Sequence, residues 1–297
     1  MFFMKKTNLI KLYCAVCDHY STVAHLAQRT SNNSRPKFSD EECITAYFWG
    51  LSTGFTRQKS IWQFTRDYLS EWFPNLPSYQ AFNRRLNFLS EVLRSLAEAL
   101  MDQVSALGGD EGTFAVDSCP VMLATRSRSS RARVAGECCS KSYNSTRKEW
   151  YYGVKLHAFV ATHEGSLAKP CALMASTASD HDLPVARRVM EECQPFRGGR
   201  LYADKAYVDS SWREELSLRR GVTLLTPRKK IKGEVVNSGD AYSSWVSSMR
   251  QPVEGFFSWL DAKNGIQDAS LVRSTQGLLV HIYGRIGVAM YGLLSNP

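Results

Sequence analysis

Apolar side chains recur at helical spacing through the N-terminal third of the chain. Between Asn8 and Gln28, and again between Tyr79 and about Leu107, they fall every three or four positions, as on the buried face of a helix. Ser39 and Glu42 match the capping box, a polar pair that marks the first turn of a further helix. The pattern predicts an all-α domain over residues 1–108.

Beyond this domain the pattern changes to that of strands alternating with helices. Residues 152–162 and 167–175 predict a β-hairpin, and short apolar runs at 113–116 and 201–203 predict two buried strands. Helical patterns follow the hairpin and each later strand. An order of antiparallel strands followed by βαβ units predicts an α/β fold, a mixed sheet flanked by helices, over residues 109–297.

The chain is expected to close with two helices, residues 251–263 and 275–294. Pro252 lacks an amide proton, so it fits best in the first turn of the former helix. Glu254 then lies beside the apolar stripe of that helix, near the N-terminal end. The helix dipole favours a carboxylate there, which is a structural explanation for this residue that competes with a functional one.

Charge narrows the choice of partner. The chain has 37 lysines and arginines against 28 aspartates and glutamates, a net charge of +9. This balance favours a polyanionic partner, nucleic acid before an acidic membrane, although a basic soluble protein without such a partner has the same balance. No run of about 18 apolar residues predicts a membrane span, and the N-terminus does not resemble a signal peptide. We therefore expect a cytoplasmic protein.

The eight cysteines are spread along the chain, which argues against a disulfide framework. Cys14 and Cys17 form half of a zinc signature, but no second pair follows at the required spacing. A packing role is therefore favoured over a zinc site for these two thiols.

Lysine and arginine also cluster locally. Residues 122–150 form a polar basic segment that we interpret as a loop, and a second cluster contains Arg228, Lys229 and Lys230. Each cluster is a candidate contact with a DNA backbone, and a solvated basic loop is the alternative.

One helical pattern in the N-terminal domain has the composition of a recognition helix. Residues 76–86 resemble a turn followed by a helix that presents Gln80, Asn83 and Arg84, side chains that can contact base edges. An amphipathic helix with a solvated polar face explains the same pattern.

Three carboxylates are candidates for a shared site. Asp117 and Asp204 each follow a short apolar run, and functional side chains collect where strands of an α/β sheet end. An aspartate after a strand is also a common cap or turn residue. If these two acids meet Glu254 within about 5 Å, each pair repels by roughly 3 kcal/mol at an effective dielectric of 20, so metal ions best explain such a cluster.

The pieces around these acids resemble a DDE-type transposase of a small bacterial insertion sequence. The matching pieces are FAVDS at 114–118, YYGVKLH at 151–157, SD at 179–180, YADKAY at 202–207 and R-x-x-V-E at 250–254. The YADKAY block is the most specific of them. A long gap separates the two aspartates and a shorter one precedes the glutamate, as in that family.

The resemblance implies an RNase H-like catalytic domain behind a helical part that binds DNA ends. It implies that Asp117, Asp204 and Glu254 are catalytic and hold two Mg²⁺ ions, with Mn²⁺ as a substitute. Lys205 and Arg250, beside these acids, are then candidate phosphate contacts, with surface ion pairs as the alternative. Related transposases often place a lysine seven residues after the glutamate, where this chain has Asp261. Lys263 is the nearest replacement.

The resemblance also implies partners and a reaction. The expected partners are the terminal inverted repeats of a transposon, the target DNA and a second copy of the chain in a homodimeric synaptic complex on the bacterial nucleoid. The expected reaction is cleavage of the transposon end followed by joining of its 3′-OH to target DNA. A nuclease of the same fold that cuts without joining, and a DNA-binding derivative that has lost catalysis, remain as alternatives.

Overall fold

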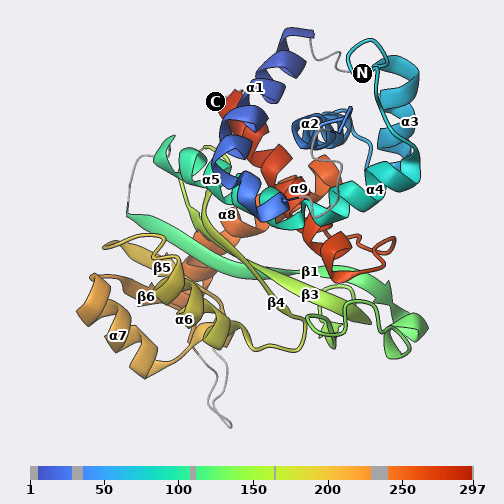
Figure 1. The fold of residues 1–297 in the computed structure, drawn as a ribbon. Coiled ribbons are helices and arrows are strands. Elements are labelled where there is room, and N and C mark those ends of the chain that lie inside the picture. The colour runs from blue at the N-terminus through green and yellow to red at the C-terminus, as the bar shows by residue number, and fades with distance from the viewer. Residues whose placement is uncertain (1–5, 29–35, 108–111, 164, 229–239, 296–297) are drawn as a thin grey trace. The chain divides into compact units, whose positions relative to one another are not determined.

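The computed structural model describes residues 6–28, 36–107, 112–163, 165–228 and 240–295 of the chain (Figure 1). The chain forms two compact units: unit 1, which contains Met1–Met101 and Leu260–Pro297, and unit 2, which contains Asp102–Trp259. Residues 260–297 thus belong to the same unit as the N-terminal helices, whereas the sequence assigned them to the second domain. The expected boundary between residues 108 and 109 lies outside the described residues.

The elements of unit 1 that the structure describes are all helices. Its elements are α1 (Lys6–Val23), η1 (Ala24–Ala27), α2 (Asp40–Ser52), α3 (Gln58–Tyr68), α4 (Tyr79–Phe88), the start of α5 (Ser90–Leu107), the end of α8 (Ala241–Asn264) and α9 (Thr275–Ser295). The predicted capping box begins α2: the amide of Glu42 donates to Ser39 Oγ at 3.1 Å, and the amide of Ser39 donates to Glu42 Oε2 at 2.6 Å. The all-α prediction is confirmed for this part of the chain.

The predicted helix from Tyr79 to Leu107 is in fact two helices, α4 and α5. They meet at Leu89, which has φ −82° and ψ 11° and is fully buried. No glycine or proline marks the break, and the apolar pattern continues through it. Periodicity alone therefore could not show that the chain turns here.

Close packing joins the two ends of the chain within unit 1. A Cβ atom on Gly284 of α9 would lie 2.4 Å from the ring of Tyr47 on α2, and one on Gly287 would lie 2.7 Å from the ring of Phe48.

By length and composition α9 could also cross a membrane, but 56% of its apolar window is buried inside the protein. The core helix of a soluble protein passes the same test, so this is weak evidence for a membrane span.

Unit 2 is built on a six-stranded mixed sheet in the order β2-β3-β1-β5-β6, with β4 also paired to β3. The strands are β1 (Thr113–Thr125), β2 (Ser140–Asn144), β3 (Glu149–Ala161), β4 (Lys169–Thr177), β5 (Arg200–Tyr202) and β6 (Thr223–Leu225). β3 is antiparallel to β1, β2 and β4, whereas β5 is parallel to β1 and to β6. This confirms the predicted mixed sheet and the predicted hairpin, which is β3 and β4. The segment 122–150, expected to be a loop, contains strand β2.

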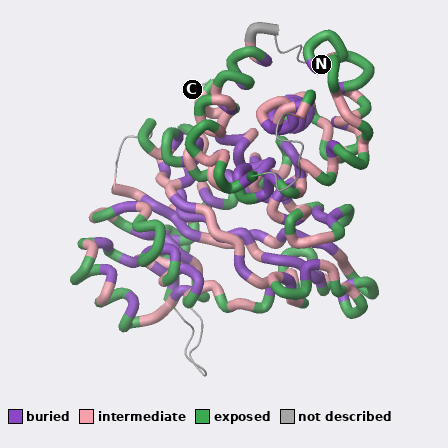
Figure 2. The backbone as a smooth tube through the Cα atoms, in the orientation of Figure 1, coloured by how far each residue is buried: buried purple, intermediate pink, exposed green. Residues whose placement is uncertain are grey.

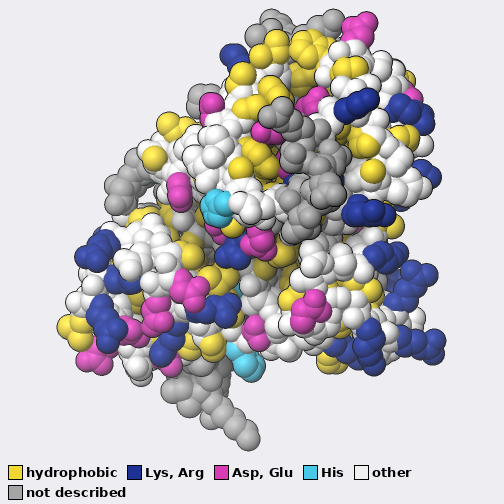
Figure 3. Space-filling model, viewed as in Figure 1, with side chains coloured by type: hydrophobic (Ala, Val, Ile, Leu, Met, Phe, Trp, Pro, Cys, Tyr) yellow, Lys and Arg dark blue, Asp and Glu magenta, His cyan; other side chains and the backbone are white. Residues whose placement is uncertain are grey.

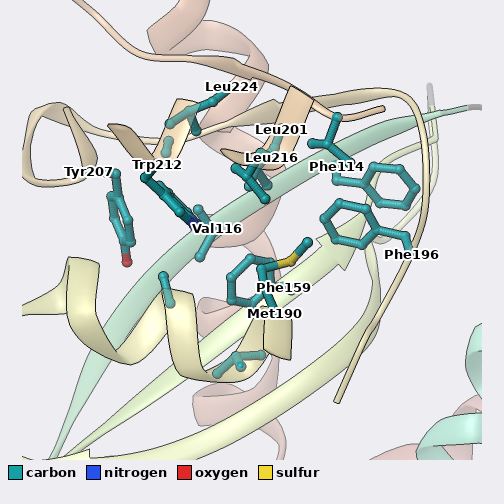
Figure 4. Close-up of a cluster of buried hydrophobic side chains, with 14 of the residues drawn as sticks. Phe114, Val116, Phe159, Met190, Phe196, Leu201, Tyr207, Trp212, Leu216 and Leu224 are labelled. Atoms are coloured by element: carbon teal, nitrogen blue, oxygen red, sulfur yellow. The ribbon is translucent and has the colours of Figure 1, made fainter. Parts of the chain in front are cut away.

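Helices α6 (Asp182–Glu192) and α7 (Ser210–Arg220) cover the sheet through a continuous apolar core (Figure 4). Phe114 of β1 stacks on Phe196 with ring centroids 3.7 Å apart, and Trp212 and Leu216 of α7 complete the same cluster. In Figure 2 the buried backbone of this unit follows the central strands β1 and β3. The core therefore fixes the part of β1 that carries the first candidate acid.

Strand β1 is much longer than the sequence predicted. The predicted strand was the apolar run 113–116 with Asp117 at its end, but β1 continues through Pro120 to Thr125. Beyond Ala115 only β3 pairs with β1 among the described strands. One edge of β1 is then open, so a proline without an amide proton fits there.

Helix α8 begins ten residues before the predicted start, at Ala241 rather than at 251. Pro252 therefore lies inside the helix and not in its first turn, and Glu254 is not near its N-terminal end. An internal proline costs about 3 kcal/mol. Complete burial of Val246, Val253 and Phe256 offsets that cost.

Gly153→Ala is expected to destabilise unit 2 by about 3 kcal/mol, the upper part of the usual range for overpacking. A Cβ atom at Gly153 on β3 would lie 2.1 Å from the carbonyl oxygen of Val121 on β1, so the two central strands would have to separate. Chemical denaturation followed by circular dichroism measures the change. Gly292→Ala is the control, because nothing lies within 4 Å of a Cβ atom at that helical glycine. Equal stability of both variants would contradict this account.

Candidate active site

The two candidate aspartates lie at the same level of the sheet. The parallel pairing of β1 with β5 ends with Ala115 opposite Tyr202, and Asp117 and Asp204 each follow two residues later. Asp117 lies within β1, opposite Ala158 of β3. The carboxyl end of this parallel pair therefore presents both acids, although β1 itself does not end there.

Asp204 begins a short 3₁₀ turn, η3 (Lys205–Tyr207), and accepts a hydrogen bond from the amide of Ala206 at 2.7 Å. Asp117 accepts from the amide of Ser118 at 2.8 Å. The Asp117 side chain is only 23% exposed. The carboxylate is therefore largely withdrawn from water, and one of its oxygens has a backbone donor.

Glu254 reaches this site through an arginine. The guanidinium of Arg250 on α8 donates from Nη1 to Asp117 Oδ2 and from Nη2 to Glu254 Oε1, the latter at 2.5 Å. Arg250 and Glu254 are one helical turn apart, so both side chains leave the same face of α8. The structure thus places Arg250 between two of the acids.

The electrostatics of Asp117 connect all three acids. The pKa of Asp117 is raised from its ordinary value of 3.8 to about 6, chiefly by burial; the charges of Asp204 and Glu254 also raise it, whereas Arg250 and the Ser118 amide lower it. The three acids are therefore neighbours in one electrostatic cluster. Among the described residues, however, no group of three or more His, Cys, Asp or Glu side chains is close enough to hold a metal ion. The guanidinium of Arg250 lies between Asp117 and Glu254.

Comparison with known families identifies the chain. The family model of the transposase DDE domain matches residues 109–290 of the sequence, which is more than half of the chain. The chain belongs to the DDE transposases. Searches of curated proteins and of solved structures found no significant match. The mixed sheet, its flanking helices and the helical N-terminal region agree with the RNase H-like fold of this family. DDE transposases act on DNA and generally use divalent metal ions.

By their chemistry, though not at their present spacing, the carboxylate oxygens of Asp117, Asp204 and Glu254 suit a hard divalent cation. Asp117 and Glu254 already share one cationic partner, and the charge of Asp204 acts on Asp117. The hydroxyl of Tyr207 is buried and has no hydrogen-bond partner among the described residues. Burial, and then the charges of Asp182, Asp117 and Asp204, raise its pKa well above 10, so it stays a neutral donor beside these acids.

A fourth acid, Asp182, lies next to the cluster and was not among the predicted site residues. Asp182 Oδ1 accepts from Ser118 Oγ and from Lys155 Nζ, each at 3.0 Å. Sequence reasoning had one signal for it, because Lys155 and Asp180 belong to pieces that resemble the family. The distance between Lys155 and Asp182 depends on the fold and could not be seen in the sequence.

His157 is a buried residue of β3. Its Nε2 is 2.9 Å from Ser176 Oγ, and burial lowers its pKa to about 4. The ring is therefore neutral at physiological pH.

The remaining predicted contacts with DNA are exposed side chains where the structure describes them. Lys205 is exposed on η3, Arg84 on α4 and Lys263 near the end of α8. Arg228 lies 4.0 Å from Asp240 and over the ring of Tyr242. Lys229 and Lys230 lie outside the described residues.

Unit 1 contains a groove of about 650 Å³ with a basic lining. The lining includes Arg57, Lys59, Arg273 and Arg285 against the single acid Asp268. Arg57 precedes α3 and makes no capping hydrogen bond, so the first-turn amides of α3 have no side-chain acceptor from the cap. Arg285 is 4% exposed and donates to the carbonyl oxygens of Thr56, Asn264 and His281. Asn83 of the predicted recognition helix also lines this groove, whereas Arg84 does not.

Proposed function

We propose that this protein is a transposase that cleaves the DNA at transposon ends and joins the freed 3′-OH ends to target DNA by metal-dependent phosphodiester transfer. The observation that carries the proposal is that Asp117 and Glu254 share Arg250 while the charge of Asp204 acts on Asp117, at the carboxyl end of the central parallel strand pair. The proposed origin is a bacterial insertion sequence, and the proposed location is the cytoplasm, on the nucleoid.

Asp117, Asp204 and Glu254 would hold Mg²⁺, with Mn²⁺ as a substitute. The bound ions would activate the attacking hydroxyl and stabilise the leaving oxygen of an in-line displacement. The amides of Ser118 and Ala206 each bind one oxygen of an aspartate, and the second oxygen of Asp117 accepts from Arg250, so Arg250 would have to release it to a metal ion. Tyr207 Oη would donate a hydrogen bond into the site, and Lys205 would contact a phosphate beside it.

The expected reaction has two steps at one site. In the first, water attacks the phosphorus at the transposon end, and the 3′ oxygen of the transposon leaves. In the second, that 3′-OH attacks a phosphodiester of the target, and a target 3′ oxygen leaves. Each step exchanges one P–O bond for another, so no external energy source is needed.

A strand-transfer assay tests the proposal. Purified protein, Mg²⁺, a duplex that carries the terminal repeat and a supercoiled target plasmid should give joined products. Cleavage without joining would favour the nuclease, and binding without cleavage would favour the inactive derivative. A homodimer should assemble on paired ends, which light scattering of the complex measures.

DNA binding should depend strongly on salt through the groove of unit 1. Replacing Arg57 or Lys59 by glutamine should reduce the slope of log affinity against log salt by about 1 for each phosphate that the variant no longer neutralises. Fluorescence anisotropy from 50 to 200 mM salt measures the slope. Lys11→Gln is the matched control, because Lys11 is exposed on α1 of the same unit and does not line the groove. Equal slopes for all three variants would show that the groove does not contact the DNA backbone.

A further inference from the structure

The hairpin formed by β2 and β3 exposes two large aromatic side chains. Tyr143 is 49% exposed and Trp150 is 51% exposed. They are cross-strand partners in the β2–β3 register, with ring centroids 5.3 Å apart and ring planes at 62°. A cross-strand aromatic pair supports a hairpin by roughly 0.2–1 kcal/mol, but this contribution does not require both residues to be half exposed.

Positive charge surrounds this pair. Lys141 Nζ lies 4.6 Å from the centroid of the Trp150 ring. Around it, the segment from η2 (Arg126–Ser130) to β3 carries exposed lysines and arginines: Arg126, Arg128, Arg131, Arg133, Lys141, Arg147 and Lys148. Its acids are Glu137 and Glu149, and Glu149 is paired with Arg126 at 3.3 Å. Figure 3 shows the basic side chains gathered over the end of unit 2 that contains η2.

The combination identifies the chemistry of the ligand. Exposed rings within a basic surface fit a polyanion that also has flat apolar faces, and nucleic acid has both. Every base can stack on an aromatic ring, whereas the phosphates are attracted by neighbouring arginines and lysines. An exposed aromatic patch that served a protein partner would be expected to have a rim of mixed charge.

We propose that Tyr143 and Trp150 form a base-stacking platform that holds an unpaired nucleotide of the DNA, while the arginines between 126 and 133 hold the phosphates next to it. This inference rests on the proposed function, because cleavage at a transposon end produces unpaired or distorted nucleotides close to the cut. The platform selects unpaired bases, since the faces of paired bases are covered by their neighbours in the stack.

Binding to three probes tests the platform: an oligothymidine, an end duplex with an unpaired overhang and the same duplex with a blunt end. Trp150→Ala and Tyr143→Ala should each weaken binding of the first two probes by about 5- to 100-fold and leave the blunt duplex within about twofold. Trp150→Phe should restore most of the affinity, because phenylalanine keeps a ring to stack on. Tyr68→Ala is the matched control, as Tyr68 is 76% exposed in unit 1.

The salt dependence separates stacking from charge. Trp150→Ala should leave the salt slope unchanged, whereas Arg131→Gln and Arg133→Gln should lower it by about 1 for each phosphate that the variant no longer neutralises. Thermal melting of each variant identifies any that lose the fold. If an alanine variant does not fold, the comparison of Trp150→Phe, Arg131→Gln and Arg133→Gln with the wild type replaces it. Equally weakened binding of all three probes would overturn the platform, and so would weakened binding to anionic vesicles but not to oligothymidine.

The two proposals fail separately. If the wild-type protein joins DNA strands and Trp150→Ala binds oligothymidine as tightly as the wild type does, the platform is wrong and the transposase stands. If the wild-type protein neither cuts nor joins, yet Trp150→Ala weakens binding of oligothymidine, the platform stands without the proposed reaction.

Discussion

Asp204→Asn is expected to reduce both cleavage and joining by about a thousandfold while leaving DNA binding intact. The substitution removes one negative charge from the proposed metal site. Loss of a bound metal ion removes several kcal/mol of transition-state stabilisation, and each 1.4 kcal/mol or so is tenfold in rate. Asparagine can still accept the hydrogen bond from the Ala206 amide, since it is as good a cap as aspartate, so the turn at η3 should persist.

The measurement is single-turnover cleavage of an end duplex, with binding followed in parallel at the same salt concentration. Asp209→Asn is the control. Asp209 caps α7 in the same way, by accepting from the amide of Trp212 at 2.7 Å, and its ion-pair partner is Arg187 outside the acid cluster. The control should keep nearly full activity. Full activity of Asp204→Asn would rule out a shared metal site that includes this residue.

Local chemistry explains which features the sequence could predict. The capping box at Ser39 can be recognised from two residues three positions apart. The hairpin β3–β4 can be recognised from the alternation of apolar and polar residues and from the turn residues between its strands. Gly221 ends α7 in the left-handed conformation, with φ 67°, where glycine is the usual residue after a helix. Each of these signals is complete within a few residues of the chain.

Features that depend on long-range packing were not predictable in the same way. Pro252 lies inside α8 because distant apolar surfaces bury the helix on both sides of it, and no local rule contains that information. Asp117 lies in the middle of β1 because β3 supports the strand beyond the point where β5 ends. The sequence predicted that the acid follows an apolar run, but not that the strand continues.

The candidate site shows the same division. The residue types and their order predicted three acids that belong together. Arg250 was expected to contact a phosphate, whereas in the structure it donates to Asp117, 133 positions away, and to Glu254 on its own helix. Asp182 was missed because its partners, Ser118 and Lys155, are separated from it by 64 and 27 positions.

Asp117→Asn is expected to stabilise the metal-free protein at pH 7 while abolishing its activity. The pKa of Asp117 is raised to about 6 in the folded protein, chiefly by burial, from 3.8 in an ordinary environment. Between these values the folded state binds more protons than the unfolded state, so this residue lowers stability as the pH rises from about 4 to about 6. About 1.4 kcal/mol per pKa unit gives a cost on the order of 1–3 kcal/mol at pH 7, which a neutral asparagine avoids.

Denaturation at pH 4.5 and pH 7, with and without Mg²⁺, measures this effect. The wild-type protein should regain stability at pH 7 when Mg²⁺ is added, because a cation offsets the buried charge, and Asp117→Asn should not respond to the metal. Asp209→Asn should show the opposite sign and lose stability at pH 7, since the Trp212 amide lowers the pKa of Asp209. If Asp117→Asn were less stable than the wild type at pH 7 without metal, the ion pair with Arg250 would outweigh the cost of burial. The pair of Asp117 and Arg250 would then be a structural ion pair. It would not be part of a metal site whose uncompensated charge lowers the stability of the metal-free protein.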